Sequence, residues 1–273
     1  WAARTAGAWG NSLQVSVCPS ATAYEETNKT TTNDSSISIG DTTLTLTSGT
    51  DFNVGDIINF GETGGHEYRI TAVSSNDITF VRHPSGTGGL HTALAGGTQV
   101  RRRWRYYDLV DKAPGTSTYT STRSGANDEM HIVVIDEDGG ITGTAGEVLE
   151  VYDSVSKASD AKTAQGDSNY YADVIYNKSQ YIYWMDHNTG GSNWGSTASG
   201  TTFTAVDSPF VDSLVSGADG SAVTTAEMKT AYEKFADGDT LDVNLIIAGK
   251  GDATHIDNLI TIAENRKDAV VFC

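Results

Sequence analysis

The chain has 273 residues, and its 35 acidic against 18 basic side chains give a net charge of −17, while 38% of residues are hydrophobic. That length allows one large domain or two ordinary ones, and the composition excludes a disordered chain. No run approaches the roughly 20 apolar residues of a membrane span, and the acidic balance argues against nucleic-acid binding. Two cysteines, Cys18 and Cys273, are too few for a disulfide scaffold or a multi-cysteine zinc site. Whether they pair stays open, and two buried thiols are the simplest interpretation.

The first stretch contains one expected strand, because Leu13, Val15 and Val17 alternate with polar residues or cysteine. Residues 25–36 are rich in Thr, Asn and Ser without periodicity, and we expect a linker there. The chain opens at Trp1 without an initiator methionine and stops within an apolar run at residues 269–273. We therefore expect a piece of a longer protein, or only the ordered part of one.

Residues 35–105 are expected to form a small inserted domain. Alternating runs at 43–47, 54–60, 68–73 and 77–81 are separated by Gly, Asn and Ser. This pattern is typical of the short strands of a small barrel or sandwich. The polar segment before the runs and a Gly-rich segment at 86–97 after them indicate an insertion.

The next part begins with a strong expected strand at 131–135, closed by a turn at 136–140. Residues 144–155 fit two interpretations: a helix capped by Thr144 and Glu147, or a strand returning from the turn. Residues 173–176 and 181–184 are rich in β-formers and are expected to be strands. Residues 187–223, largely Gly, Ser, Thr and Asp, are expected to form a loop.

The tail of the chain has the clearest pattern. Thr224 and Glu227 match a capping box, followed by an apolar stripe to Phe235 that predicts a helix ending at Gly238. A strand over 241–247, a helix around 256–263 and a strand over 269–272 complete a βαβ order, which predicts parallel pairing.

The densest positive charge lies at residues 101–105. On an expected strand, Arg101, Arg103 and Arg105 share one face, and Arg102 and Trp104 share the other. Three interpretations remain, in this order: a salt-bridged surface strand, contact with an acidic partner such as another copy of the chain, and nucleic-acid binding.

No catalytic, cofactor or metal site emerges from the other motifs. The acidic turn at 136–138 lacks EF-hand spacing, and the Gly-rich loop at 248–252 lacks P-loop spacing. The six histidines show no metal-ligand spacing, and no nucleophile elbow is present. The five tryptophans are expected to be scattered over the units, which argues against a glycan-binding groove. We therefore predict a protein that is not an enzyme.

Several stretches in colinear order resemble the tail sheath protein of contractile-tailed bacteriophages of the myovirus type, most closely those of marine cyanophages. Residues 3–15, in which Ala6 stands where the family often has proline, are the first, and residues 101–115, 128–136, 146–156 and 231–249 follow. No single motif is very specific, and the order of the stretches carries the resemblance. It favours the strand interpretation of residues 144–155.

The resemblance implies a mixed α/β (α+β) fold, with a sheath-type core, a βαβ unit at its C-terminal end and an inserted small all-β domain. Residues 1–34 would begin the core, residues 35–105 would form the insertion, and residues 106–273 would continue the core, incomplete at its C-terminus. The family's N-terminal arm and its C-terminal core and arm fall outside this sequence.

The function that the resemblance implies is mechanical. Subunits would assemble with one another as stacked hexameric rings, a helical homo-oligomer, around the tail tube protein, and contract to drive the tube through the host envelope. Baseplate and tail terminator proteins are the other implied partners, without direct nucleic-acid contact or membrane insertion. The subunit would belong to the virion tail and assemble in the host cytoplasm, with Arg101, Arg103 and Arg105 as candidate subunit-interface residues. The alternatives are the sheath of a tailocin or contractile injection system, and a secreted carbohydrate-binding or hydrolytic β-rich protein.

Overall fold

The computed structural model describes residues 1–272, and the chain divides into one unit from Trp1 to Ala218 and a second from Asp219 onward. The structure is rich in sheet, with 29% of residues in strands and 18% in helices. The predicted mixed α/β class is confirmed at this coarse level. Each unit is described by itself.

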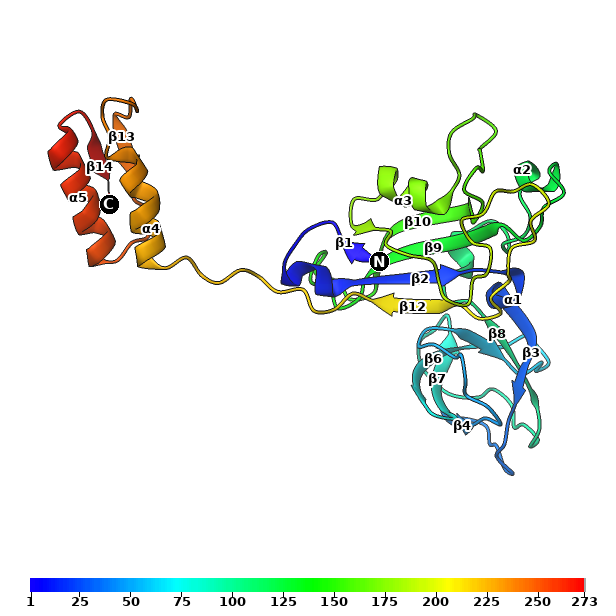
Figure 1. The fold of residues 1–273 in the computed structure, drawn as a ribbon. Coiled ribbons are helices and arrows are strands. Elements are labelled where there is room, and N and C mark those ends of the chain that lie inside the picture. Colours follow the sequence, from blue (N-terminus) through cyan, green and yellow to red (C-terminus); the bar gives the residue numbers. More distant parts are fainter. Residues whose placement is uncertain (273) are drawn as a thin grey trace. The chain divides into compact units, whose positions relative to one another are not determined.

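The first unit is built on a four-stranded antiparallel sheet (Figure 1). One of its two central strands, β9 (Glu129–Asp136), is buried on both faces. Leu13, Val15 and Val17 face one hydrophobic cluster, while Cys18 faces another, so the predicted alternation is confirmed. Cys18 is a buried free thiol, whereas Cys273 lies outside the described residues. The strands run in the order β10 (Glu147–Ser156), β9 (Glu129–Asp136), β2 (Leu13–Cys18) and β12 (Phe210–Ser213).

Strands β9 and β10 form an antiparallel hairpin, so the strand interpretation of residues 144–155 is the correct one. Strand β12 lies inside the segment 187–223 that we expected to be loop, and that expectation is wrong for four residues. Only Phe210 and Val211 are apolar there, so β12 is held mainly by backbone pairing with β2 and carries little hydrophobic pattern.

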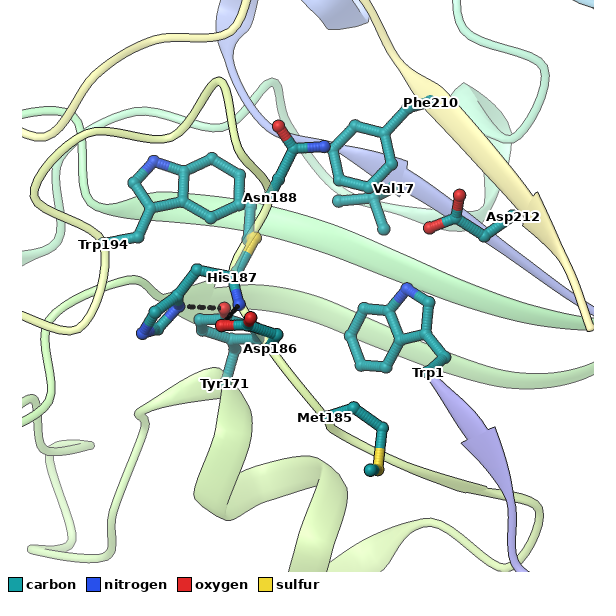
Figure 2. A pocket seen from close by; sticks show the side chains of 11 residues that line it. Trp1, Val17, Tyr171, Met185, Asp186, His187, Asn188, Trp194, Phe210 and Asp212 are labelled. Atoms are coloured by element: carbon teal, nitrogen blue, oxygen red, sulfur yellow. Dashed lines mark hydrogen bonds between the residues drawn. The ribbon is translucent and has the colours of Figure 1, made fainter.

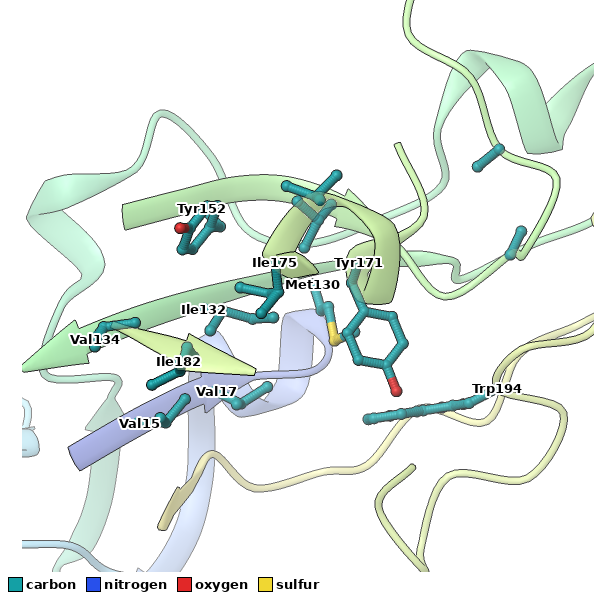
Figure 3. Close-up of a cluster of buried hydrophobic side chains, with 14 of the residues drawn as sticks. Val15, Val17, Met130, Ile132, Val134, Tyr152, Tyr171, Ile175, Ile182 and Trp194 are labelled. Carbon is teal, nitrogen blue, oxygen red and sulfur yellow. The ribbon is translucent and has the colours of Figure 1, made fainter. Parts of the chain in front are cut away.

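Helix α3 (Tyr171–Lys178) covers one face of this sheet (Figure 3). Residues 173–176, predicted as a strand, lie within it. Tyr171, Val174 and Ile175 recur at helical spacing and are buried against Met130 and Ile132, and burying each such side chain stabilises the fold by about 1.5–3 kcal/mol. This tertiary burial outweighs the β-propensity of the segment. The prediction at 181–184 is confirmed in part, since β11 (Ile182–Tyr183) pairs with β1 (Ala2–Ala3).

A six-stranded antiparallel sheet wraps around a separate core in the same unit. A bridge between Thr32 and Leu46 joins its two outer strands, which closes the sheet into a small barrel. Its strands run in the order β3 (Glu25–Thr31), β8 (Gln99–Arg103), β5 (Ile57–Asn59), β6 (Glu67–Ser74), β7 (Asp77–His83) and β4 (Thr43–Thr45).

The linker predicted at residues 25–36 is wrong over β3. This strand pairs with β8 through its backbone and none of its residues is buried, so the sequence has no apolar alternation. The chain leaves the core sheet through α1 (Ala21–Tyr24) and returns at Trp104, whose backbone N–H bonds to the carbonyl of Tyr24 at 2.8 Å. The barrel is therefore an excursion whose two ends meet. A short helix, α2 (Thr118–Ser121), follows the return.

The second unit has the predicted βαβ order. Helix α4 (Thr225–Tyr232) begins with the predicted capping box of Thr224 and Glu227, and a 3-10 turn over Glu233–Phe235 follows it. Strands β13 (Leu245–Ile247) and β14 (Val270–Phe272) pair in parallel, connected by α5 (Ala253–Arg266). Ile246, Leu259 and Ile262 form its small core.

Candidate functional site

The arginine segment, residues 101–105, comprises the end of strand β8 and the two residues after it. It lies along the boundary between the barrel and the core sheet. Arg102 and Trp104 are buried, whereas Arg101 is exposed and Arg103 and Arg105 are partly exposed. The predicted division of this segment into two faces is therefore confirmed.

The Arg102 guanidinium binds groups within the chain. Its guanidinium is fully buried, with Nη2 lying 3.2 Å from Glu26 Oε2 and Nη1 donating to the carbonyl of Asp51 at 2.7 Å. Nη2 also donates to the carbonyl of Asp207, which precedes β12. One guanidinium thus ties the barrel to the core sheet.

Arg103 is also compensated within the chain. It forms ion pairs with Glu67 at 2.9 Å and Glu25 at 3.3 Å, and its guanidinium lies 4.7 Å from the ring centre of Tyr107. Two carboxylates neutralise its charge, so Arg103 fits the salt-bridged interpretation of the segment.

Arg101 and Arg105 form no ion pair with any described residue. Arg105 lines a cleft of about 500 Å³ between the barrel and the β9–β10 turn, with its guanidinium 5.0 Å from the ring centre of Tyr106. Gly55 leaves room for this side chain, because a Cβ there would lie 2.2 Å from Arg105 Cδ. Of the three predicted interface residues, two therefore present positive charge that is not held in an ion pair with a described residue.

A second site, which we call the aromatic pocket, lies over β2 and β12 (Figure 2). It holds about 210 Å³, and Val17 and Met130 of the core sheet contribute to its lining. Figure 2 shows the rings of Trp1 and Trp194 on opposite sides of the pocket. Its lining residues are Trp1, Val17, Met130, Tyr171, Met185, Asp186, His187, Asn188, Trp194, Phe210 and Asp212.

Hydrogen bonds hold the aromatic lining in place. Trp184 Nε1–H donates to Tyr171 Oη at 3.1 Å, and Tyr171 Oη lies 2.6 Å from His187 Nδ1. Burial raises the pKa of Tyr171, so its hydroxyl stays protonated and bridges Trp184 and His187. Trp194 Nε1–H donates to the carbonyl of Thr204 at 3.1 Å.

This pocket was not predicted from the sequence. The expectation that the tryptophans are scattered is wrong, because Trp1, Trp9, Trp184 and Trp194 all pack on one hydrophobic cluster. Residues 1 and 184 approach only because β1 pairs with β11, and no local pattern encodes that contact.

A third feature is the outer face of the second unit's sheet. Ile246 and Val271 point toward α5, and the alternate residues point away and are exposed by half or more. An apolar patch of this kind usually marks a contact surface. Its members are Leu245, Ile247, Val270 and Phe272.

The remaining sequence candidates serve local structure. Asp136 accepts hydrogen bonds from Ser12 and Thr142 and closes the β9–β10 turn. Asp252 accepts from the backbone N–H of His255, so a carboxylate already occupies the N-terminus of α5 in the Gly-rich loop. Within residues 1–272, no group of three or more histidine, cysteine or acidic side chains is arranged to hold a metal ion.

No protein-family model matches the chain, and the search of curated proteins finds no match. In the part of the chain that the structure describes, no helix combines the length and apolar character needed to cross a bilayer.

Proposed function

We propose that this chain is a structural subunit of a contractile phage tail sheath. Copies would stack as hexameric rings around the tail tube and contract to drive the tube through the host envelope. The colinear resemblance of five stretches to sheath proteins is the starting point.

The exposed apolar face of the β13–β14 sheet is the observation that supports assembly most directly. Leu245, Ile247, Val270 and Phe272 are 51%, 67%, 58% and 60% exposed on a two-stranded parallel sheet. Parallel sheets are ordinarily covered on both faces, so this face needs another protein segment over it. A subunit that works only within an assembly has such a requirement.

The free arginines support the same proposal through charge. Arg101 and Arg105 lack carboxylate partners in a chain of net charge −17, so a neighbouring copy offers acidic surface. Contraction requires two packings of one subunit that differ by a modest free energy, and polar contacts can exchange partners between them. Arg103, which is neutralised internally, is expected to contribute less.

The proposed partners are other copies of the chain, the tail tube protein, and the baseplate and tail terminator proteins, in a virion tail assembled in the host cytoplasm. The subunit would act without catalysis, nucleic-acid contact or membrane insertion. A tailocin or contractile injection system is the nearest alternative, distinguished by the absence of a DNA-filled capsid. The aromatic pocket favours one candidate of a different class, a carbohydrate-binding or hydrolytic protein.

Cryo-electron microscopy of the native source tests the proposal. We expect this chain in stacked six-fold rings around an inner tube. A monomer or a small closed oligomer in the native source would contradict it.

Charge reversal tests the arginine contacts. We expect Arg101→Glu with Arg105→Glu to weaken assembly and to change its salt dependence, measured by sedimentation. Lys162→Glu with Lys178→Glu is the matched control, because both lysines are exposed and the change in net charge is the same. If both double variants assemble equally well, Arg101 and Arg105 do not contact a neighbouring subunit.

A further inference from the structure

We infer that the aromatic pocket binds a compact organic cation, a group of the alkylammonium class. This inference does not depend on the proposed sheath function. It is carried by three features of the pocket: its size, its charge and its aromatic side chains.

The size of the pocket limits the ligand. A volume of about 210 Å³ is below the range of drug-sized or nucleotide sites, and it suits one small head group. Val17 and Met130 close the pocket on the side of the core sheet, so the ligand enters from solvent and stops on an apolar surface.

The charge of the lining selects a positive ligand. Asp186 and Asp212 both line the pocket, and no lysine or arginine does. The Asp212 carboxylate forms no hydrogen bond or ion pair with any residue in the described range, and the Asp186 carboxylate accepts only the backbone N–H of His187. Both carboxylates are exposed, so they attract a cation to the pocket and repel an anion.

The aromatic rings supply the second recognition element. Trp1 and Trp194 stand on opposite sides of the pocket with Tyr171 between them in the lining (Figure 2). An organic cation within about 6 Å of such ring centres is attracted by their electron-rich faces, most strongly by tryptophan. Trp194 already contacts one ammonium in this way, since Lys157 Nζ lies 5.3 Å from its ring centre. Lys157 is buried outside the lining and donates to the carbonyls of Pro19 and Asn127, so it does not fill the pocket.

The site is organised before a ligand arrives. The bonds from Trp184 to Tyr171 and from Tyr171 to His187 fix the ring of Tyr171, and the bond to Thr204 fixes Trp194. A preformed aromatic site loses less conformational entropy on binding than one that must assemble. A free quaternary ammonium compound and the ammonium end of a lysine side chain both offer a positive charge carried on an alkyl group. The test separates these two sources.

Tryptophan fluorescence and calorimetric titration of the full chain test the inference. The probes are choline, Nα-acetyl-lysine methylamide, glucose and 3,3-dimethylbutan-1-ol, the uncharged isostere of choline. We expect at least one cation to bind at least about fivefold more tightly than the isostere, which corresponds to about 1 kcal/mol. Preference between the two cations identifies the free amine or the lysine side chain as the source.

Matched variants locate the binding. Asp212→Asn is expected to weaken cation binding about fivefold, and Asp111→Asn, an exposed change outside the pocket, is expected to leave it unchanged. Both carboxylates are exposed, so both variants should fold, which circular dichroism checks. Equal binding of choline and its isostere, binding of glucose alone, no binding of either cation, or equal effects of the two substitutions would each overturn the inference.

Discussion

The indole Nε1–H of Trp104 donates a 3.0 Å hydrogen bond to the hydroxyl of Ser16, and both side chains are buried. The indole also stacks on the His131 ring, with centres 6.0 Å apart and planes 20° apart. Ser16 belongs to β2 and His131 to β9, so the residue that ends the barrel excursion is fixed to both central strands of the core sheet.

Truncating this residue should destabilise the first unit. We expect Trp104→Ala to lower the free energy of unfolding by about 3–5 kcal/mol, because it removes a buried indole and leaves a cavity. Ser16→Ala should cost less, about 1–3 kcal/mol, because it removes little volume but leaves the buried indole N–H without an acceptor. Urea unfolding measures both values, and equal losses for the two variants would contradict the assigned role of the ring.

Removing the carboxylate beside Arg102 should expose the cost of a buried charge. We expect Glu26→Gln to destabilise the first unit by about 1–3 kcal/mol, because the fully buried guanidinium loses its counter-charge. Glu25→Gln is the matched control and should cost less than about 1 kcal/mol, since its partner Arg103 is partly exposed and keeps Glu67. If urea unfolding gives the same loss for both, burial is not what distinguishes the two arginines.

Asp56 should make the barrel less stable at higher pH. Burial is the dominant cause that raises the pKa of this carboxyl from an ordinary 3.8 to about 7, against a hydrogen bond from Asn53 and nearby positive charges that lower it. The folded state therefore holds a proton that the unfolded state has released, and stability falls as the pH rises from about 4 through 7. We expect Asp56→Asn to flatten this dependence between pH 5 and 8 in thermal unfolding. An unchanged pH profile would show that Asp56 does not titrate in this range.

Asp136 should act in the opposite direction. Burial alone would raise its pKa, but hydrogen bonds from Ser12, Thr142 and Ile141 outweigh it and lower the pKa to about 2. The stabilisation is present above the ordinary pKa of 3.8 and is lost as the pH falls toward 2. We expect Asp136→Asn to reduce stability at pH 7 and to remove part of the acid-induced loss. Asp111→Asn, the exposed control, should alter neither.

Elements with strong local patterns were predictable. The alternation of Leu13, Val15 and Val17 arises because one face of β2 packs against the core, and the box of Thr224 and Glu227 satisfies donors at the start of α4. Each of these signals spans only a few residues and depends on no distant contact.

The errors have a different physical origin. Strand β3 is held by backbone bonds to β8, which leave no trace in side-chain polarity, and α3 is helical because Tyr171, Val174 and Ile175 find a buried surface. Among the site features, the division of residues 101–105 into two faces was predicted from the sequence. The carboxylates that neutralise Arg103 come from Glu25 and Glu67, and the aromatic pocket joins residues more than 200 positions apart. Such sites depend on tertiary pairing.

The backbone hydrogen bond between Trp104 and Tyr24 holds the two ends of the barrel segment together. The length of that segment can therefore change without disturbing the pairing of the core sheet. Because the chain departs and returns at one point, a longer, shorter or unrelated domain between these residues would impose no new closure strain on β2 and β9. The barrel is therefore the part of the first unit where changes in chain length should be tolerated best, because β2 and β9 can keep their register when its length changes.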